Sequence, residues 1–250
     1  MAVGAFCKLL LRELGIQVYS HVISIRNVRI TDELLDSVSI DLIPRIESSE
    51  LRCCDPALDE SMKASVDDAI DRGDTLGGTF EVRAAGVPPG LGSHVHWDRK
   101  LDGRLAQALM SINAIKAVET GSGLEKAPMG SEFHDEIFYD DEKREFYRKT
   151  NRAGGIEGGT SNGQEIIVRA VVKPIATLKR PLMSVNLETK EAFKAQYERS
   201  DTCVVPAAGV IGEAMVAIVL VQAIQEKFGG DNLSELKNNL ESFRERVRAM

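Results

Sequence analysis

A glycine-rich run and two charged segments that follow it carry the residues best suited to ligand chemistry. The run at 154–163 contains five glycines, and it is followed by the segment 173–177 and then by Arg199 and Asp201. Glycine turns let backbone amides approach a ligand closely, and Lys173 with Arg199 supplies fixed positive charge beside the Asp201 carboxylate. The set predicts a binding site for an anionic, phosphate-bearing ligand.

The elements around the glycine run exclude the common nucleotide-binding motifs. Residues 165–172 alternate as a strand, so the run precedes a strand and Lys173 follows it. A dinucleotide fingerprint or a P-loop needs a strand, then a glycine turn, then a helix, and neither GxGxxG nor GxxxxGK[ST] occurs in the chain. The sequence therefore disfavours a Rossmann or P-loop site.

Composition and charge limit the class of protein. The chain has 250 residues, 43% of them hydrophobic, which is enough for one large domain or two modest ones. Its net charge of -7 argues against a broad nucleic-acid or membrane surface, so positive charge for a ligand has to be concentrated locally. Cys7, Cys53, Cys54 and Cys203 lack Cys-x-x-Cys spacing, and adjacent cysteines make a poor disulfide. We therefore expect a reduced, cytoplasmic protein with no metal site.

Hydrophobic periodicity predicts a mixture of helices and strands. Apolar residues recur every fourth position from 58 to 70, after the helix-starting pair Asp55 and Pro56 and before Gly73. The chain begins inside another helix with no capping residue, which hints at an upstream segment. We expect helices at 3–14, 31–42, 55–73, 101–112, 204–224 and 233–247, and strands at 16–25, 79–85 and 165–172.

Two segments call for separate interpretation. The longest apolar run, 204–224, is interrupted by proline, glycine and glutamate, which predicts a buried helix rather than a membrane span. Residues 130–152 are dense in charged and aromatic side chains and show little periodicity. For that segment we expect a mobile surface loop, of the kind that forms lids.

Five segments resemble the chorismate synthase family, in that family's order and spacing from residue 3 to the end of the chain. They are GDTLGG at 73–78, VHWDRKLD at 95–102, MSINAIK at 110–116, the glycine run with KPI at 173–175, and RSD at 199–201. The resemblance implies one domain over 1–250, with an α+β fold: a β-α-β sandwich whose helices lie between two antiparallel sheets. It also implies a homotetramer.

The same resemblance implies an activity and its cofactors. Chorismate synthases convert 5-enolpyruvylshikimate 3-phosphate to chorismate by an anti 1,4-elimination of phosphate, the last step of the shikimate route to aromatic amino acids. The reaction depends on reduced FMN, and NADPH is implied only if the enzyme reduces its own flavin. The implied partners are this small-molecule substrate and further copies of the chain, with no nucleic acid and no membrane.

Site residues carry over from the family only where its motifs match this chain. Asp201 is the implied catalytic residue, a general base that helps to relay the hydrogen removed from the substrate. Thr202, which follows it, departs mildly from the family's usual residues. The implied flavin contacts are Asn113, Ala114, Gly158, Lys173, Pro174, Ile175, Ala176, Thr177 and Arg199.

The family's chains are longer, and the part without a counterpart in this sequence carries two histidine acids, a serine-rich flavin contact and most substrate-binding arginines. None of His21, His94, His96 or His134 fits the two histidine roles by motif. The alternative function is therefore a catalytically inactive form that only binds FMN or assembles. A wrongly assigned start at Met1 is a third interpretation.

Structural interpretations also stand beside the functional ones. Without the family, the glycine run would be an ordinary loop, and Arg199 with Asp201 would form a structural ion pair. His96, beside Trp97, suits a packing role at the start of a helix. Cys203 suits a small buried residue, because nothing basic is adjacent to activate its thiol.

Overall fold

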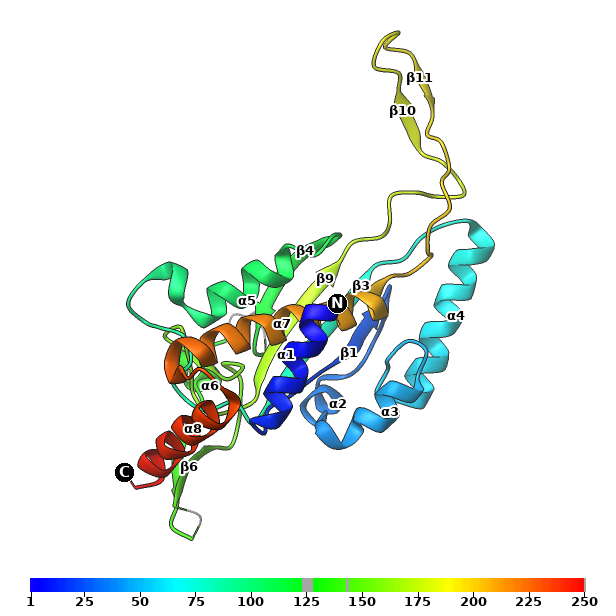
Figure 1. Cartoon of the computed structure of the whole chain (residues 1–250). Coiled ribbons are helices and arrows are strands. Elements are labelled where there is room, and N and C mark those ends of the chain that lie inside the picture. The colour runs from blue at the N-terminus through cyan, green and yellow to red at the C-terminus, as the bar shows by residue number, and fades with distance from the viewer. Residues whose placement is uncertain (123–127, 143, 250) are drawn as a thin grey trace.

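The computed structural model describes residues 1–122, 128–142 and 144–249. Its centre is a five-stranded antiparallel sheet (Figure 1). Polar residues on four neighbouring strands lie opposite one another across the middle of that sheet. In the strand register His21 faces Glu81, Glu81 faces Arg169, and Arg169 faces Glu119. In spatial order the strands are β2 (Val28–Arg29), β1 (Gln17–Ile25), β3 (Gly78–Ala85), β9 (Ile166–Val172) and β4 (Ile115–Thr120).

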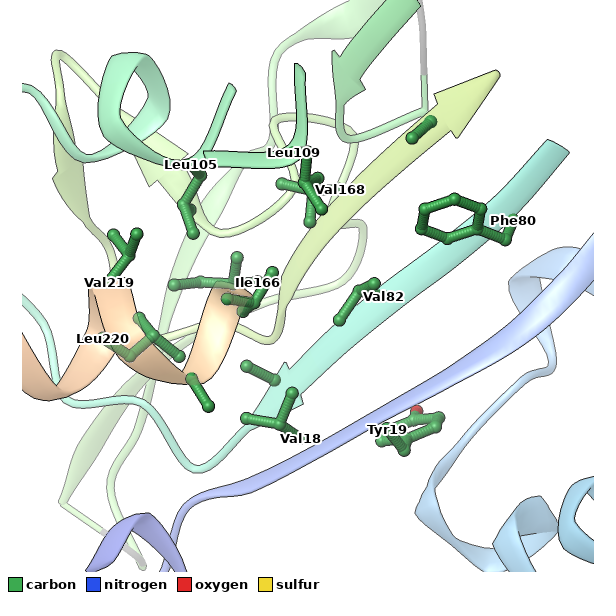
Figure 2. Packing of buried hydrophobic residues seen from close by; sticks show 14 of the residues in the cluster. Val18, Tyr19, Phe80, Val82, Leu105, Leu109, Ile166, Val168, Val219 and Leu220 are labelled. Atoms are coloured by element: carbon green, nitrogen blue, oxygen red, sulfur yellow. The ribbon is translucent and has the colours of Figure 1, made fainter. Parts of the chain in front are cut away.

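A layer of three helices covers one face of this sheet. They are α1 (Ala2–Glu13), α5 (Leu101–Met110) and α7 (Val205–Phe228), with α7 crossing β1 and β3 (Figure 1). Phe80 and Val82 of β3 point at α7, where Gly212 leaves room for the Phe80 ring. Figure 2 shows Val168 of β9 beside Leu109 of α5 in the same apolar layer. The last helix of the chain, α8 (Leu233–Arg248), packs on the end of α7 through the rings of Phe228 and Phe243.

Helix α7 confirms the prediction of a core helix. It is long and apolar enough to cross a membrane by length and composition, but most of its apolar window is buried inside the structure. Its buried glutamate, Glu213, accepts hydrogen bonds from Ser20 and Arg52 and also pairs with Lys8. The charge that interrupts the apolar run is therefore neutralised by side chains from β1, α1 and the segment before α4.

A second group of helices lies on the other side of β1 and β2, and all of its members except α4 are short. Backbone carbonyls of Leu35 and Val38 accept hydrogen bonds from Arg83 of β3, which holds this layer against the sheet. Helix α4 starts at an Asp55 N-cap and ends at Gly73 in a left-handed conformation, as the sequence predicts. The elements are α2 (Asp32–Asp36), η1 (Ile40–Leu42), α3 (Ile43–Ser48) and α4 (Pro56–Arg72).

Three two-stranded hairpins and two short helices complete the described chain. The segment 130–152, for which we expected a mobile surface loop, contains an aromatic hairpin in which Phe138 stacks on Tyr147 and Tyr139 contacts Phe146. Its mobility stays a prediction, and Lys143 lies outside the described residues. The remaining elements are η2 (Trp97–Arg99), α6 (Gly130–Phe133), β5 (Ile137–Asp140), β6 (Glu145–Arg148), β7 (Ile156–Glu157), β8 (Thr160–Ser161), β10 (Met183–Val185) and β11 (Ala192–Lys194).

The α+β class with antiparallel sheets is confirmed. The expected helix at 31–42 is two short pieces instead, and residues 115–120 and 183–194 form strands that periodicity did not predict. Within the described ranges the helix layer is covered by a large sheet on one side only. Its other side exposes apolar side chains such as Val3 and Phe6 of α1.

Candidate functional site

The end of β9 and the start of β4 bring two of the predicted cofactor segments together. Lys173 follows β9 directly, and its backbone N–H donates to the carbonyl of Ala114 at 2.9 Å. Ala114 adopts a φ of 72°, a left-handed conformation that costs a non-glycine residue energy and is often found at functional sites. Because β4 and β9 are antiparallel neighbours, Ala114 and Lys173 meet although 59 positions separate them in sequence. We call this place, where β9 ends and β4 begins, the β4–β9 edge.

The loop between α4 and β3 ties the other predicted segments to the same edge. Thr75 donates its hydroxyl to the carbonyl of Ile175 at 2.6 Å, and the Leu76 N–H donates to the carbonyl of Thr202 at 2.8 Å. The Ser200 hydroxyl in turn donates to the carbonyl of Thr177 at 3.1 Å. The chain therefore holds residues 173–177 beside the Asp201 segment, although about 25 residues separate them in sequence.

The charged side chains at this edge are exposed and uncompensated. Lys173, Arg199 and Asp201 are all exposed, and no ion pair joins any of them to another residue in the described ranges. The structure therefore does not show the structural Arg199–Asp201 pair. Exposed cations next to an exposed backbone can bind an anionic ligand, whereas the Asp201 carboxylate is open to solvent in this chain.

Gly158 is the predicted contact that lies apart from the others. It sits in the exposed turn between β7 and β8, with a φ of 62° and open space where a side chain would be. The neighbouring Gly159 carbonyl accepts from the Leu101 N–H at the start of α5, whereas Asn113 follows the end of that helix. A helix of this length separates the two by about 15 Å at 1.5 Å per residue. The structure therefore does not place Gly158 beside Lys173, and its role stays a prediction.

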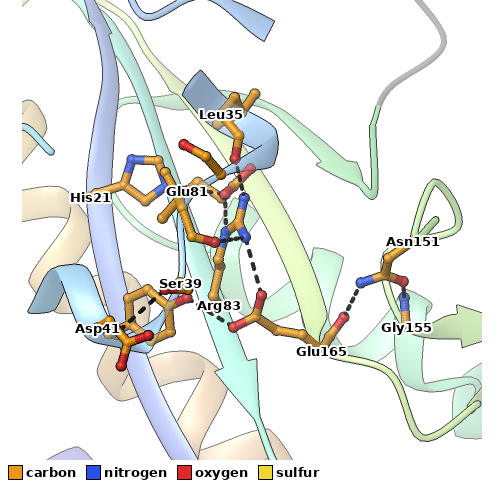
Figure 3. Close-up of polar contacts among 12 residues, drawn as sticks. His21, Leu35, Ser39, Asp41, Glu81, Arg83, Asn151, Gly155 and Glu165 are labelled. Carbon is orange, nitrogen blue, oxygen red and sulfur yellow. Dashed lines mark hydrogen bonds and ion pairs between the residues drawn. The ribbon is translucent and has the colours of Figure 1, made fainter. Parts of the chain in front are cut away.

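A buried charge network on the sheet face away from α7 was missed by the sequence analysis (Figure 3). Glu81 is fully buried and accepts from His21 Nε2 at 3.0 Å, from Arg83 Nε at 2.5 Å and from Arg169 Nε at 2.6 Å. Burial alone would raise the pKa of Glu81, but the His21 hydrogen bond and the two arginines lower it to about 2. The signal was available, since charged residues occupy alternate positions of otherwise apolar strands.

Glu165 and Tyr19 extend this network toward a cavity of about 1030 Å³. Arg83 also donates to Glu165 at 3.1 Å, and the Tyr19 hydroxyl donates to the same carboxylate at 2.9 Å. Burial raises the pKa of Glu165. Both acidic and basic side chains line the cavity, so we interpret the network as a structural support for the sheet rather than as a ligand site of one charge sign.

Comparison with known proteins places the chain in a family. A family model described as "Chorismate synthase" matches residues 1–225. The chain belongs to the chorismate synthase family. The "Chorismate synthase" of Solibacter usitatus (strain Ellin6076) is 56% identical over 254 residues, which cover 99% of this chain and 64% of that protein. The "Chorismate synthase" of Geobacter sulfurreducens is 50% identical over 257 residues, which cover 100% of this chain and 65% of that protein.

A solved structure agrees with the sequence matches. The chain superposes on a structure titled "Crystal Structure of Chorismate Synthase" with a TM-score of 0.84 and 42% sequence identity, covering 100% of this chain and 68% of that one. The chain thus spans about two thirds of the length of the chorismate synthases it matches. The mixed fold with antiparallel sheets is the one that the resemblance to chorismate synthase implied.

The residues at the β4–β9 edge fit the flavin that the chorismate synthase family implies. Lys173 and Arg199 are exposed cations that form no ion pair within the described ranges, which suits a phosphate group. Pro174 cannot donate a backbone hydrogen bond, and Thr75 holds the Ile175 carbonyl, so the segment 173–177 does not join a strand. Lys173, Pro174 and Ala176 are exposed in it. These two cations therefore fit the phosphate group of such a cofactor.

Proposed function

We propose that this chain forms the flavin side of a chorismate synthase active site. The reaction is the anti 1,4-elimination of phosphate from 5-enolpyruvylshikimate 3-phosphate to give chorismate, with reduced FMN as cofactor. The observation that supports it is the meeting of Ala114, the segment 173–177 and the Asp201 segment at one edge. Lys173 and Arg199 are exposed there and form no ion pair with another described residue. The proposal includes a cytoplasmic homotetramer, and NADPH only if the enzyme reduces its own flavin.

The proposed roles follow from charge and position. Lys173 and Arg199 bind anionic groups of the cofactor and the substrate, and the segment 173–177 positions the flavin through its backbone. Asp201 accepts the proton that leaves the substrate ring when its C–H bond breaks, while the C–O bond to phosphate breaks on the opposite face of the ring. Reduced FMN supplies electron density that helps phosphate to leave. Exclusion of water from Asp201 needs a surface that covers it, since the carboxylate is exposed.

The decisive experiment measures chorismate formation under anaerobic conditions, with the flavin absorbance followed in the same cuvette. We expect Asp201→Asn to lower turnover by about 100- to 10,000-fold with little change in FMN affinity, since it removes a proton acceptor only. Lys173→Ala should weaken FMN binding by about 10- to 100-fold, because a charge-assisted hydrogen bond contributes about 1.5–3 kcal/mol. Lys237→Ala, an exposed lysine on α8 far from the edge, is the control.

Each outcome distinguishes between the proposed roles. Equal losses of turnover and FMN affinity in Asp201→Asn would contradict a role for Asp201 at the reacting centre. Unchanged affinity in Lys173→Ala would mean that the edge does not hold the flavin. Flavin binding by the unmodified chain without any turnover would overturn the catalytic proposal for these 250 residues and leave a binding function.

A further inference from the structure

One of the five segments that match the chorismate synthase family has no role in the proposed function. This is the segment 73–78, GDTLGG, which runs from the end of α4 into the first residue of β3. Its one charged residue, Asp74, is acidic, so the segment does not suit a phosphate group. Its role therefore lies in its contacts with other parts of the chain.

The first residues of this segment form a turn that is fixed by local bonds. Gly73 adopts a φ of 68°, the left-handed conformation that ends α4. The Asp74 N–H donates to the Ala69 carbonyl at 2.9 Å, and the Asp74 carboxylate accepts from the Thr75 N–H at 2.8 Å. These bonds hold the backbone immediately before Thr75.

The side chain of Thr75 reaches a distant part of the chain. Thr75 is buried, with 8% of its surface exposed, and its hydroxyl donates to the Ile175 carbonyl at 2.6 Å. Ile175 is the central residue of the segment 173–177, which we call the proposed flavin segment. A single hydroxyl therefore joins the turn after α4 to the backbone that we place along the cofactor.

The residue after Thr75 holds the segment that carries the proposed catalytic residue. The Leu76 N–H donates to the Thr202 carbonyl at 2.8 Å, and Leu76 forms a parallel bridge with Cys203. Thr202 follows Asp201 directly. Two consecutive residues thus bond to the two halves of the proposed site, one through its side chain and the other through its backbone.

Gly77 brings the same turn against the end of β9. A Cβ at this position would overlap the Val172 carbonyl and lie 2.9 Å from Pro174 Cδ. Only glycine leaves room for this approach, so the backbone of the turn lies directly beside the start of the proposed flavin segment. The contact of Thr75 with Ile175 is therefore one part of a close packing between the two segments.

We propose that Thr75 is a positioning residue for the flavin, because its hydroxyl fixes the proposed flavin segment relative to the Asp201 segment. Thr75 acts through Ile175 and, by way of Leu76, on the backbone next to Asp201. The inference rests on the proposed function, since it gives the Ile175 segment its cofactor. Groups that hold a cofactor and a substrate must keep fixed distances, so loosening this contact weakens cofactor binding.

The affinity for FMN, measured by quenching of flavin fluorescence, tests the role of the hydroxyl. Thr75→Val keeps the branched shape and removes one neutral hydrogen bond, so we expect FMN binding to weaken by about 3- to 10-fold. Thr75→Ser keeps the hydroxyl and should restore the affinity to within about twofold. Thr31→Val is the matched control: Thr31 caps α2 beside β2, at the opposite edge of the sheet. It should lower Tm and leave FMN affinity unchanged.

Amide hydrogen exchange in the flavin-free chain tests the contact without the cofactor. The Leu76 N–H, which bonds to Thr202, should exchange about 3- to 10-fold faster in Thr75→Val than in the unmodified chain. The amides in the middle of β3 should exchange as before. The Thr75→Ser chain should behave like the unmodified one.

The two measurements separate this inference from the proposed function. Unchanged FMN affinity in Thr75→Val, whatever the exchange rates, would overturn Thr75 as a positioning residue for the flavin. Equal losses of affinity in Thr75→Val and Thr75→Ser would overturn the hydroxyl as the cause. An unmodified chain that binds no FMN would overturn the proposed function and the cofactor role of Thr75 with it. Faster exchange at Leu76 would then still support the bond between the two segments.

Discussion

The substitution Glu81→Gln tests whether the buried charge network holds the central sheet together. Glu81 is fully buried and lies on β3, between the neighbouring strands β1 and β9. Glutamine keeps the size of the side chain but removes the negative charge that faces Arg83 and Arg169. Both guanidinium groups are almost completely buried, so neither would gain access to water. Arg169 would lose the charge of this carboxylate, and Arg83 would keep Glu165 as its acidic partner.

The expected loss of stability is large for a single isosteric change. Removing one partner of a buried ion pair typically costs about 3–5 kcal/mol. In a chain of this size each kcal/mol lowers the melting temperature by roughly 2–4 °C, so Tm should fall by about 6–20 °C. The control is Glu226→Gln, which removes a half-exposed partner of Arg104 and should cost at most about 1 kcal/mol.

Thermal and urea unfolding followed by circular dichroism measure this difference, and its pH dependence gives a second check. The pKa of Glu81 is about 2 in the folded protein, below its usual value near 4.5. Its contribution is therefore complete at neutral pH and is lost as the pH falls from about 4.5 toward 2. The gap between the unmodified chain and Glu81→Gln should narrow over that window. A shift in Tm no larger than that of Glu226→Gln at pH 7 would refute the reasoning.

Two further predictions concern helix packing and capping, and both use unfolding by urea as the assay. Gly212→Ala should destabilise the chain by about 1–3 kcal/mol, because a Cβ would lie 2.8 Å from the Phe80 ring. Gly103→Ala, where the nearest atom is 3.5 Å away, should instead add up to about 1 kcal/mol, and equal effects would contradict the packing argument. Asp55→Ala removes the carboxylate that caps α4 at Leu58 and should cost about 1 kcal/mol, whereas Asp67→Ala within that helix should be nearly neutral.

Local patterns in the sequence predicted a helix or strand well where the apolar periodicity and the capping residues indicate the same boundaries. The helix from Pro56 to Arg72 was predicted because a capping aspartate, a proline at the first turn and a closing glycine all act within the segment itself. The strand 115–120 was missed, because only Ile115 in it is buried and its pairing with β9 is set by residues far along the chain. The hairpin 183–194 was missed because its side chains face solvent on both sides.

For the candidate site, the sequence by itself determined the residue types: a lysine, an arginine and an aspartate near glycine-rich turns, in an order that matches one family. Only the tertiary structure decided which of them meet. Antiparallel pairing of β4 and β9 joins Ala114 to Lys173, and the loop after α4 holds the Asp201 segment beside them, whereas α5 keeps Gly158 away. The physical reason is that backbone hydrogen bonds between distant segments fix these distances, and neither hydrophobic periodicity nor motif spacing contains that information.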